Sequence, residues 1–207
     1  SYGAARAILD FGSEDLKAAW LPKLASGDAI GAIGFAEVQD VVPATSSVSF
    51  SGGALSGTKP SVSAGLKADI AIVLACAAGE PVLVAANLAG VQRQGFNTFD
   101  NSRCTANLVF HETPATLLAS GNAAMQGALG ILAQQAVVTA HEQTGGAEAL
   151  MERARDYALT RRAFGQPIGA FQSVKHRIAE LYGLVELARA GALHAASREG
   201  QPDFLKA

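Results

Sequence analysis

Two adjacent arginines lie where the sequence predicts the end of a helix. Residues 157–172 read YALTRRAFGQPIGAFQ, so that Arg161 and Arg162 come just before a Phe-Gly-Gln-Pro interruption. Because glycine and proline end helices, we expect one helix to stop here and another to begin near Gln172. Backbone amides at a helix start, next to a guanidinium, bind anionic groups such as a pyrophosphate. An anion site at this turn is therefore one interpretation of these residue types.

Phe164 lies in the same turn and permits two interpretations. In the first, its ring offers an apolar face to an aromatic group that is bound beside the anion. In the second, Arg161 and Arg162 offset the dipole of their own helix C-terminus, and Phe164 fills the core. The residues of this stretch alone leave both interpretations open.

The elements that carry these residues follow from the spacing of apolar side chains. Residues 1–24 are expected to be helical, and Ser13, which precedes two acidic residues, is expected to be an N-cap. Residues 29–112 combine short apolar runs with Gly, Ser and Thr, which predicts an antiparallel sandwich or barrel. We expect its strands at Ala29–Ala36, Ser47–Phe50, Ala54–Ser56, Ile70–Ala75, Pro81–Ala86, Gly90–Phe96 and Ala106–Phe110.

Helical spacing returns from about Ser120 to the end of the chain. Apolar residues recur at helical intervals from Met125 to Ala140 and again from Val174 to Ala192. We expect two long antiparallel helices that form a hairpin through a turn at Phe164–Ala170. The Gly145-Gly146 pair would bend the first helix or allow another helix to pack closely against it.

Composition narrows the classes of function. The chain has 207 residues, of which 49% are hydrophobic, which is enough to bury a core in one or two domains. Its 16 Lys and Arg against 18 Asp and Glu argue against a general nucleic-acid binder. Thr113–Ala140 lacks charged residues, yet its polar and small residues predict an Ala-rich buried helix and no membrane span. No signal peptide is recognisable, so we expect a soluble, cytoplasmic protein.

The cysteines and histidines show no metal-ligand spacing. Cys76 and Cys104 form no Cys-x-x-Cys motif and are expected to be reduced, buried thiols. We therefore expect no metal site, and we expect surface or packing roles for the histidines. These histidines are His111, His141, His176 and His194.

Four ordered blocks of the sequence resemble the acyl-CoA dehydrogenase family. YALTRRAFGQPIGAFQSVKHRIAEL is similar to its Tyr-Ala-x-x-Arg-x-x-Phe-Gly-x-Pro-x-x-x-x-Gln signature, and KAAWLPKLASGDAIGAIGFAE resembles its entry into the β-domain. ALSGTKPSVSAGLKAD resembles its Leu-x-Gly-x-Lys segment, and FDNSRCTANLVFHETPATLL resembles an Asp-x-Ser/Thr-Arg motif with the strand and turn that follow it. Because these blocks cover nearly the whole chain in the family's order, their combination is specific.

The resemblance implies an α+β fold of the acyl-CoA dehydrogenase type. An antiparallel β-barrel or sandwich domain would be flanked by helical segments, and the C-terminal helical hairpin would be part of a four-helix bundle. The implied domains are 1–28 (end of an N-terminal helical domain), 29–116 (β-domain) and 117–207 (first part of a C-terminal helical domain). The resemblance is to a divergent bacterial member, and it implies a chain truncated at both ends.

The resemblance also implies FAD as the cofactor, lying between the β-domain and the helical domain and reaching a neighbouring subunit. Many relatives carry threonine or glutamine at the position of Ala163, so one hydrogen bond to the cofactor is expected to be missing. The positions at or beside the family's adenosine-pyrophosphate contacts are Arg161, Arg162, Ala163, Phe164, Phe171 and Gln172.

Two further segments match the family's contacts to the isoalloxazine ring. Ser63 keeps a hydroxyl that bonds the flavin, whereas Ala36 replaces a donor threonine and Val38 replaces a proline. Each lost hydrogen bond costs on the order of 1 kcal/mol, so we expect weakened FAD binding. The alternative is a chain that keeps the fold and no longer binds the cofactor. The matching positions are Phe35, Ala36, Glu37, Ser61, Val62 and Ser63.

The family's reaction needs a carboxylate that removes the substrate α-proton while hydride passes from the β-carbon to the flavin. That glutamate lies either in a loop beyond the position of Ala207 or on the helix before Tyr157, where alignment places Gln135. Glutamine cannot accept a proton at neutral pH, and Ala136 replaces a substrate-binding arginine of many relatives. No catalytic residue is therefore identifiable in this chain.

The resemblance implies an FAD-dependent oxidoreductase that desaturates an acyl-CoA thioester between its α and β carbons and passes electrons to an electron-transfer flavoprotein. The substrate would carry a fatty or a steroid-derived acyl chain. FAD would lie at the interface of a dimer or tetramer, either homomeric or heteromeric. The alternative is a non-catalytic partner subunit in which Arg161 and Gln172 complete the FAD site of a neighbour.

Overall fold

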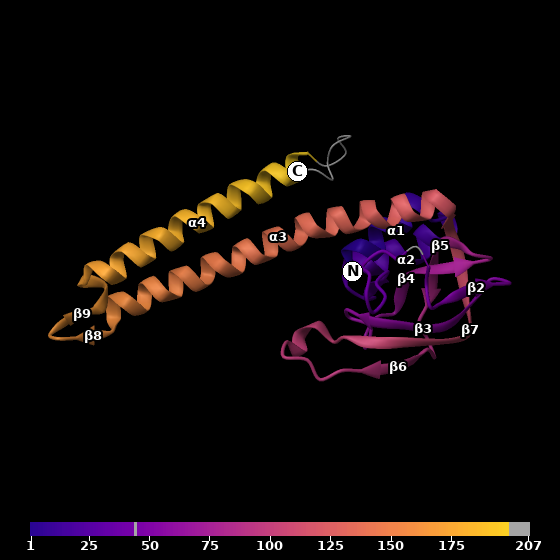
Figure 1. Cartoon of the computed structure of the whole chain (residues 1–207), viewed down its shortest axis with the longest axis horizontal. Helices are drawn as coiled ribbons and strands as arrows, with labels where there is room; N and C mark the ends of the chain where they lie inside the picture. Colours follow the sequence, from indigo (N-terminus) through magenta and orange to yellow (C-terminus); the bar gives the residue numbers. More distant parts are fainter. Residues whose placement is uncertain (44, 199–207) are drawn as a thin grey trace. The chain divides into compact units, whose positions relative to one another are not determined.

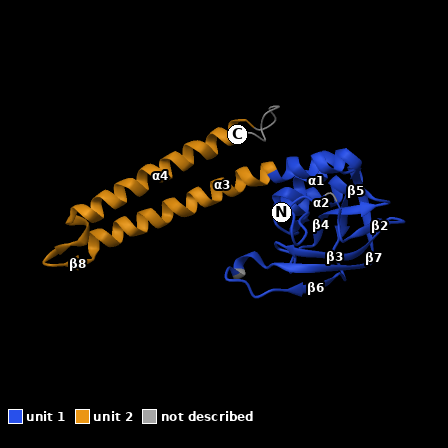
Figure 2. Ribbon diagram, viewed as in Figure 1, with its two compact units in different colours: residues 1–132 blue, residues 133–207 orange. Residues whose placement is uncertain are grey.

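The computed structural model describes residues 1–43 and 45–198 (Figure 1). Its internal contacts divide the chain into two compact units, Ser1–Leu132 and Ala133–Ala207 (Figure 2). The boundary falls inside one long helix. The division into domains 1–28, 29–116 and 117–207 stays a prediction.

The first unit begins with two short helices, α1 (Tyr2–Phe11) and α2 (Glu14–Ser26). The Ser13 side chain accepts a hydrogen bond from the backbone N–H of Leu16, which confirms the predicted N-cap. α2 ends at Gly27, whose φ of 85° lies in the left-handed region that glycine adopts without strain. The helical prediction for the N-terminal residues is thus confirmed, with a break between the two helices.

Seven strands of the first unit form one sheet. Five of these strands pair in a closed ring. β4 pairs with β2, β2 with β3, β3 with β7, β7 with β5, and β5 again with β4, which is the connectivity of a barrel. β1 and β2 pair with β4 in parallel, so the prediction of a purely antiparallel sheet was wrong. The strands are β1 (Gly31–Gly34), β2 (Ser49–Ser51), β3 (Ala54–Val62), β4 (Ile70–Ala77), β5 (Glu80–Asn87), β6 (Gln92–Gly95) and β7 (Ala106–Ser120).

The apolar residues of β4 supply both faces of the sheet with a core. Ala71 and Val73 lie in a buried cluster to which the other strands of the ring contribute. Ile70, Ile72 and Leu74 point the other way, into a cluster shared with α1 and with the start of the next long helix. Successive side chains of a strand point to opposite faces, so an uninterrupted apolar run indicates a strand that is covered on both.

β7 is longer than the sequence predicts, because it continues past Phe110 and through Pro114 to Ser120. The uncharged stretch Thr113–Ala140 is therefore divided between this strand and a helix, which corrects its prediction as helix throughout. In the described part of the chain, no helix is both long enough and apolar enough to cross a membrane.

Gly57 lies at a shift in the register between β3 and β7, and its φ is 124°. A Cβ at this position would lie 2.4 Å from the carbonyl oxygen of Ser47. We therefore expect Gly57→Ala to lower the free energy of unfolding by about 1–3 kcal/mol. Urea denaturation followed by the fluorescence of Trp20, the single tryptophan, measures this loss.

The matched control for this prediction is Gly130→Ala, in a helical part of the same unit. A Cβ at Gly130 meets no atom within 4 Å, so alanine should be neutral or stabilise by up to about 1 kcal/mol. Equal denaturation midpoints for both variants would contradict the expectation for Gly57.

The second unit contains a hairpin of two helices, which confirms the sequence prediction (Figure 1). Its first helix is the later part of α3 (Gly121–Thr160), which continues without interruption through Gly145 and Gly146. The connection contains β8 (Arg162–Ala163), β9 (Gln166–Pro167) and a 3-10 turn, η2 (Ile168–Ala170). The second helix is α4 (Gln172–Ser197). The first unit holds one further 3-10 turn, η1 (Asn101–Arg103).

Candidate functional site: two groups of residues at strand and helix ends

The two segments predicted to face a flavin ring lie side by side in the first unit. Phe35–Glu37 follows β1, and Ser61–Ser63 lies at and just beyond the end of β3. Gly34 brings the two together: a Cβ there would lie 3.0 Å from Cγ of Lys59 and 3.3 Å from Cγ2 of Val62. The absence of a side chain at Gly34 thus allows the end of β1 to lie directly against β3.

Only some atoms of these two segments face outward. The side chains of Phe35 and Val62 are 3% and 2% exposed and belong to the core, so they cannot contact a bound ring. Ala36 is half-buried, while Ser61 and Ser63 are exposed. Ser61 has a φ of 50°, and its backbone N–H donates to Oδ1 of Asn107. The groups left to meet a ligand are therefore the serine hydroxyls, the Ala36 methyl and backbone atoms.

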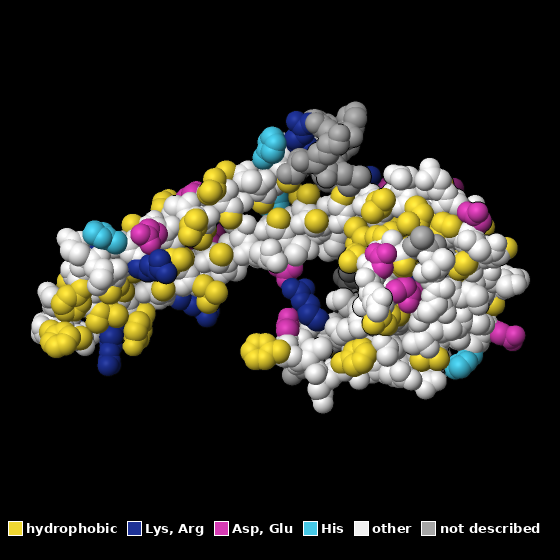
Figure 3. Space-filling model, in the orientation of Figure 1, with side chains coloured by type: hydrophobic (Ala, Val, Ile, Leu, Met, Phe, Trp, Pro, Cys, Tyr) yellow, Lys and Arg dark blue, Asp and Glu magenta, His cyan; other side chains and the backbone are white. Residues whose placement is uncertain are grey.

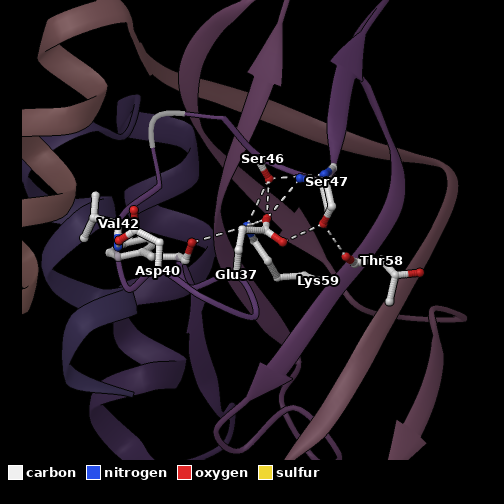
Figure 4. Close-up of polar contacts among 9 residues, drawn as sticks. Glu37, Asp40, Val42, Ser46, Ser47, Thr58 and Lys59 are labelled. Carbon is white, nitrogen blue, oxygen red and sulfur yellow. Dashed lines mark hydrogen bonds and ion pairs between the residues drawn. The ribbon is translucent and has the colours of Figure 1, made fainter.

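Glu37 is held by an ion pair that the sequence does not make obvious. Nζ of Lys59 donates to Oε1 of Glu37 at 2.7 Å, and the Lys59 side chain is 0% exposed (Figure 4). The same ammonium donates to the Phe35 carbonyl at 3.3 Å and to Oγ of Ser46 at 3.0 Å. Oγ of Ser47 donates to Oε2 of Glu37 at 2.7 Å. The carboxylate is thus used within the protein, and its predicted contact with a flavin has to come from the backbone.

The ion pair shifts the acidity of both partners. Burial raises the pKa of Glu37, but hydrogen bonds from Lys59, Ser47 and Ser46 outweigh it and hold that pKa below the usual value for glutamate. Burial lowers the pKa of the Lys59 ammonium, and the adjacent Glu37 carboxylate offsets this shift only in part. The geometry, with three hydrogen bonds from Nζ to oxygen atoms, is that of a charged lysine.

The residues predicted to bind a pyrophosphate lie together at the turn between α3 and α4. Arg161 follows the last residue of α3, and its backbone carbonyl accepts a hydrogen bond from Ile168. Arg162 and Ala163 pair with Pro167 and Gln166 in the two-residue strands β8 and β9. Arg161 and Arg162 are exposed, and the structure shows no ion pair for either guanidinium within residues 1–43 and 45–198.

The same turn presents an aromatic ring to solvent. Phe164 is 95% exposed and has a φ of 50°, a left-handed conformation that is unusual for an aromatic residue. Its ring meets that of Phe171 edge to face, with centroids 6.2 Å apart and planes at 88°. The interpretation of Phe164 as a core residue was therefore wrong for this chain by itself.

Gln172 opens α4, and its side chain is exposed. The residue before it, Phe171, offers no side-chain cap to the first amides of the helix. A helix start without such a cap leaves N–H groups that attract an anion. The exposed guanidiniums, the aromatic ring and these amides therefore have the chemistry that an adenosine-pyrophosphate group requires.

Gln135 and Ala136, at the family's catalytic positions, lie on the part of α3 that belongs to the second unit. Gln135 is half-buried, and its backbone carbonyl accepts a hydrogen bond from Thr139. Oε1 of the preceding residue, Gln134, is buried and has no hydrogen-bond partner in the described structure. Neither amide can act as a base at neutral pH.

The described residues contain no cluster of three or more His, Cys, Asp or Glu that could hold a metal ion. Cys76 and Cys104 form no disulfide in the described structure, and both are half-buried where the sequence predicted buried thiols. No redox or metal role is assigned to them.

Comparison with known proteins relates the chain to one family. Residues 122–206 match the family model described as acyl-CoA dehydrogenase, C-terminal domain. An acyl-CoA dehydrogenase of Bacillus subtilis (strain 168) is 34% identical over 215 residues, which cover 91% of this chain and 54% of the relative.

Two solved structures show the same fold. A glutaryl-CoA dehydrogenase from Mycobacterium smegmatis in complex with FADH2 superposes with a TM-score of 0.79 at 25% identity, covering 97% of this chain and 56% of that one. Butyryl-CoA dehydrogenase from Megasphaera elsdenii gives a TM-score of 0.86 at 25% identity, covering 97% and 57%.

The chain belongs to the acyl-CoA dehydrogenase family. It spans about half the length of the curated relatives that it matches over most of its own length. The predicted fold is confirmed as that of the family, with a mixed sheet and helices.

Proposed function

We propose that this chain forms part of an FAD-dependent acyl-CoA dehydrogenase that desaturates an acyl-CoA thioester between its α and β carbons. The observation that carries this proposal is the turn between α3 and α4. There Arg161 and Arg162 are exposed without an ion pair in the described chain, and Phe164 is 95% exposed at the residues that carry the family signature. Exposed groups of this kind without intramolecular partners are expected where a ligand completes the site.

The chain's own residues would bind the cofactor at two places. Arg161 and the first amides of α4 would neutralise the pyrophosphate, and Gln172 would donate to it. The hydroxyl of Ser63 would bond the isoalloxazine ring, against the backbone of Phe35–Glu37. When bound, FAD supplies the acceptor for the hydride that leaves the substrate β-carbon.

The surface of the helical hairpin supports an assembly with further helices, as in a four-helix bundle or an oligomer. Hydrophobic side chains are exposed along the hairpin (Figure 3), including Leu150 and Leu187 at 68% and 70%. A groove of about 370 Å³ runs between α3 and α4, lined by Ala147, Leu150, Met151, Ala154, Leu181, Leu184, Val185 and Ala188. Apolar surface of this extent is typical of an interface. We also propose that electrons pass to an electron-transfer flavoprotein.

A second candidate function is favoured by Gln135 and Ala136, which replace the family's base and its substrate-binding arginine. In this version the chain is a non-catalytic subunit of a heteromer, and Arg161 with Gln172 completes the FAD site of a glutamate-bearing neighbour.

One experiment distinguishes the two candidates. The full chain, alone or co-expressed with a glutamate-bearing homologue, is loaded with FAD, and an acyl-CoA is added without oxygen. Bleaching of the visible flavin band by the chain alone is expected for an enzyme, whereas bleaching only with the homologue is expected for a partner subunit. Protein that takes up no FAD in either preparation would contradict both candidates.

A further inference from the structure

Lys59 connects both ends of one long loop in the first unit. Between β1 and β2 the described residues, 35–43 and 45–48, form neither helix nor strand, and we name the part from Glu37 to Ser46 the 37–46 loop. At the start of this loop, Nζ of Lys59 donates to the Phe35 carbonyl and to Glu37. At its end, the same nitrogen donates to Oγ of Ser46 (Figure 4). One ammonium therefore joins two parts of the chain that are nine residues apart.

Glu37 closes the same loop independently of the lysine. Its Oε1 accepts from Oγ of Ser46 at 2.8 Å and from the backbone N–H of Ser47 at 3.1 Å. Oγ of Ser47 also lies 2.8 Å from the carbonyl oxygen of Thr58, which precedes Lys59 on β3, so its single proton is shared between this carbonyl and Glu37. The ion pair and the two serines thus form a polar clamp that ties the loop to β3, a strand that pairs with β7 in the sheet.

The clamp lies beside the segment that the proposed function assigns to the flavin. The Phe35 carbonyl, which Lys59 holds, immediately precedes Ala36, and Gly34 lies against the Lys59 stem. The side chains of Phe35 and Lys59 are both buried, so neither can touch a bound ring. Any effect of Lys59 on the cofactor has to be transmitted through the backbone of Phe35–Glu37.

We infer that Lys59 is a positioning residue, which fixes the Phe35–Glu37 backbone against the flavin ring by holding both ends of the 37–46 loop. This inference rests on the proposed function. Replacing both members of a buried ion pair by uncharged residues often leaves the stability of the fold unchanged. A variant without the ion pair can therefore show whether the clamp positions the flavin-facing backbone or only stabilises the fold.

The test uses the double variant Glu37→Gln/Lys59→Met of the full chain, which removes the ion pair and leaves no buried charge. We expect near-normal stability in urea but about tenfold weaker binding of FAD, which corresponds to ~1.4 kcal/mol. Amide hydrogen exchange of Ser47, whose N–H donates to Glu37, should become faster at the same time. Normal FAD affinity and normal exchange in this variant would overturn the inference.

A second variant tests the inference even if the double variant does not fold. Ser46→Ala removes one hydroxyl of the clamp and keeps the ion pair, so we expect two- to threefold weaker FAD binding and faster exchange of Val48, whose N–H donates to Ser46. The control is Ser49→Ala, which removes a hydroxyl bonded to Ser56 outside the clamp and should change neither measurement. Equal behaviour of the two serine variants would overturn the inference.

Failure of the proposed function is distinguishable from failure of the clamp. If the wild-type chain bound no FAD, the proposed function would fail, and the role of Lys59 in positioning a flavin would fail with it. The exchange of Ser47 and Val48 would still show whether the ion pair holds the loop.

Discussion

Arg161→Ala is expected to weaken the binding of FAD by roughly 10- to 150-fold. A hydrogen bond to a charged group contributes about 1.5–3 kcal/mol. In the described chain the exposed guanidinium has no ion-pair partner, so no carboxylate competes with the pyrophosphate for it. Folding should be unaffected, because the side chain projects from a turn. The measurement is a titration of FAD with the full chain, followed by quenching of flavin fluorescence.

Arg177→Ala is the matched control for this prediction. Arg177 is an exposed arginine on α4 that forms an ion pair with Glu180, and it lies outside the turn. We expect its removal to leave FAD binding unchanged. The same experiment applies to the partner-subunit candidate, with the heteromer in place of the chain alone. Unchanged flavin content in an Arg161→Ala heteromer would exclude a role of this residue in the neighbour's site.

Glu37→Gln is expected to lower the free energy of unfolding by about 3–5 kcal/mol. The substitution leaves the fully buried ammonium of Lys59 without its counter-charge, and removing one partner of a buried ion pair costs that much. Urea denaturation followed by Trp20 fluorescence measures the loss, because Trp20 packs against the core of the first unit.

The double substitution Glu37→Gln/Lys59→Met provides the control, since it removes both charges at once. We expect it to recover most of the stability that Glu37→Gln loses. If the single and the double variant were equally unstable, the loss of stability would come from changed side-chain packing and not from the unpaired charge of Lys59. A single variant with normal stability would contradict the burial of Lys59.

Local sequence patterns predicted where the strands and helices lie. Apolar runs such as Ile70–Ala75 and the Gly-rich turns between them indicate which backbone segments are buried. Each predicted segment overlaps a strand of the sheet, but β3 and β7 are longer than predicted, and β8 and β9 were not predicted. Which strands pair with each other could not be predicted from these local patterns. That β1 lies parallel to β4 depends on contacts between Gly31–Gly34 and Ile70–Val73, far apart in the sequence, and no residue type encodes them locally.

The candidate site shows the same division. Arg161, Phe164 and Gln172 were recognisable because a motif fixes their spacing, and the structure places all three at one turn. Lys59 was missed because a lysine in a strand is usually exposed. A signal did exist: Leu55, Gly57 and Lys59 alternate along β3, and Leu55 is a core residue, so the two-residue period points Lys59 inward.

Comparison of FAD with FMN tests the central claim most directly. FMN keeps the flavin ring but lacks the adenosine half that the turn at Arg161–Gln172 is proposed to bind. The wild-type chain, or its heteromer, should bind FAD at least about tenfold more tightly than FMN, and Arg161→Ala should remove most of that preference. Equal affinities of the wild-type protein for FAD and FMN would contradict the account.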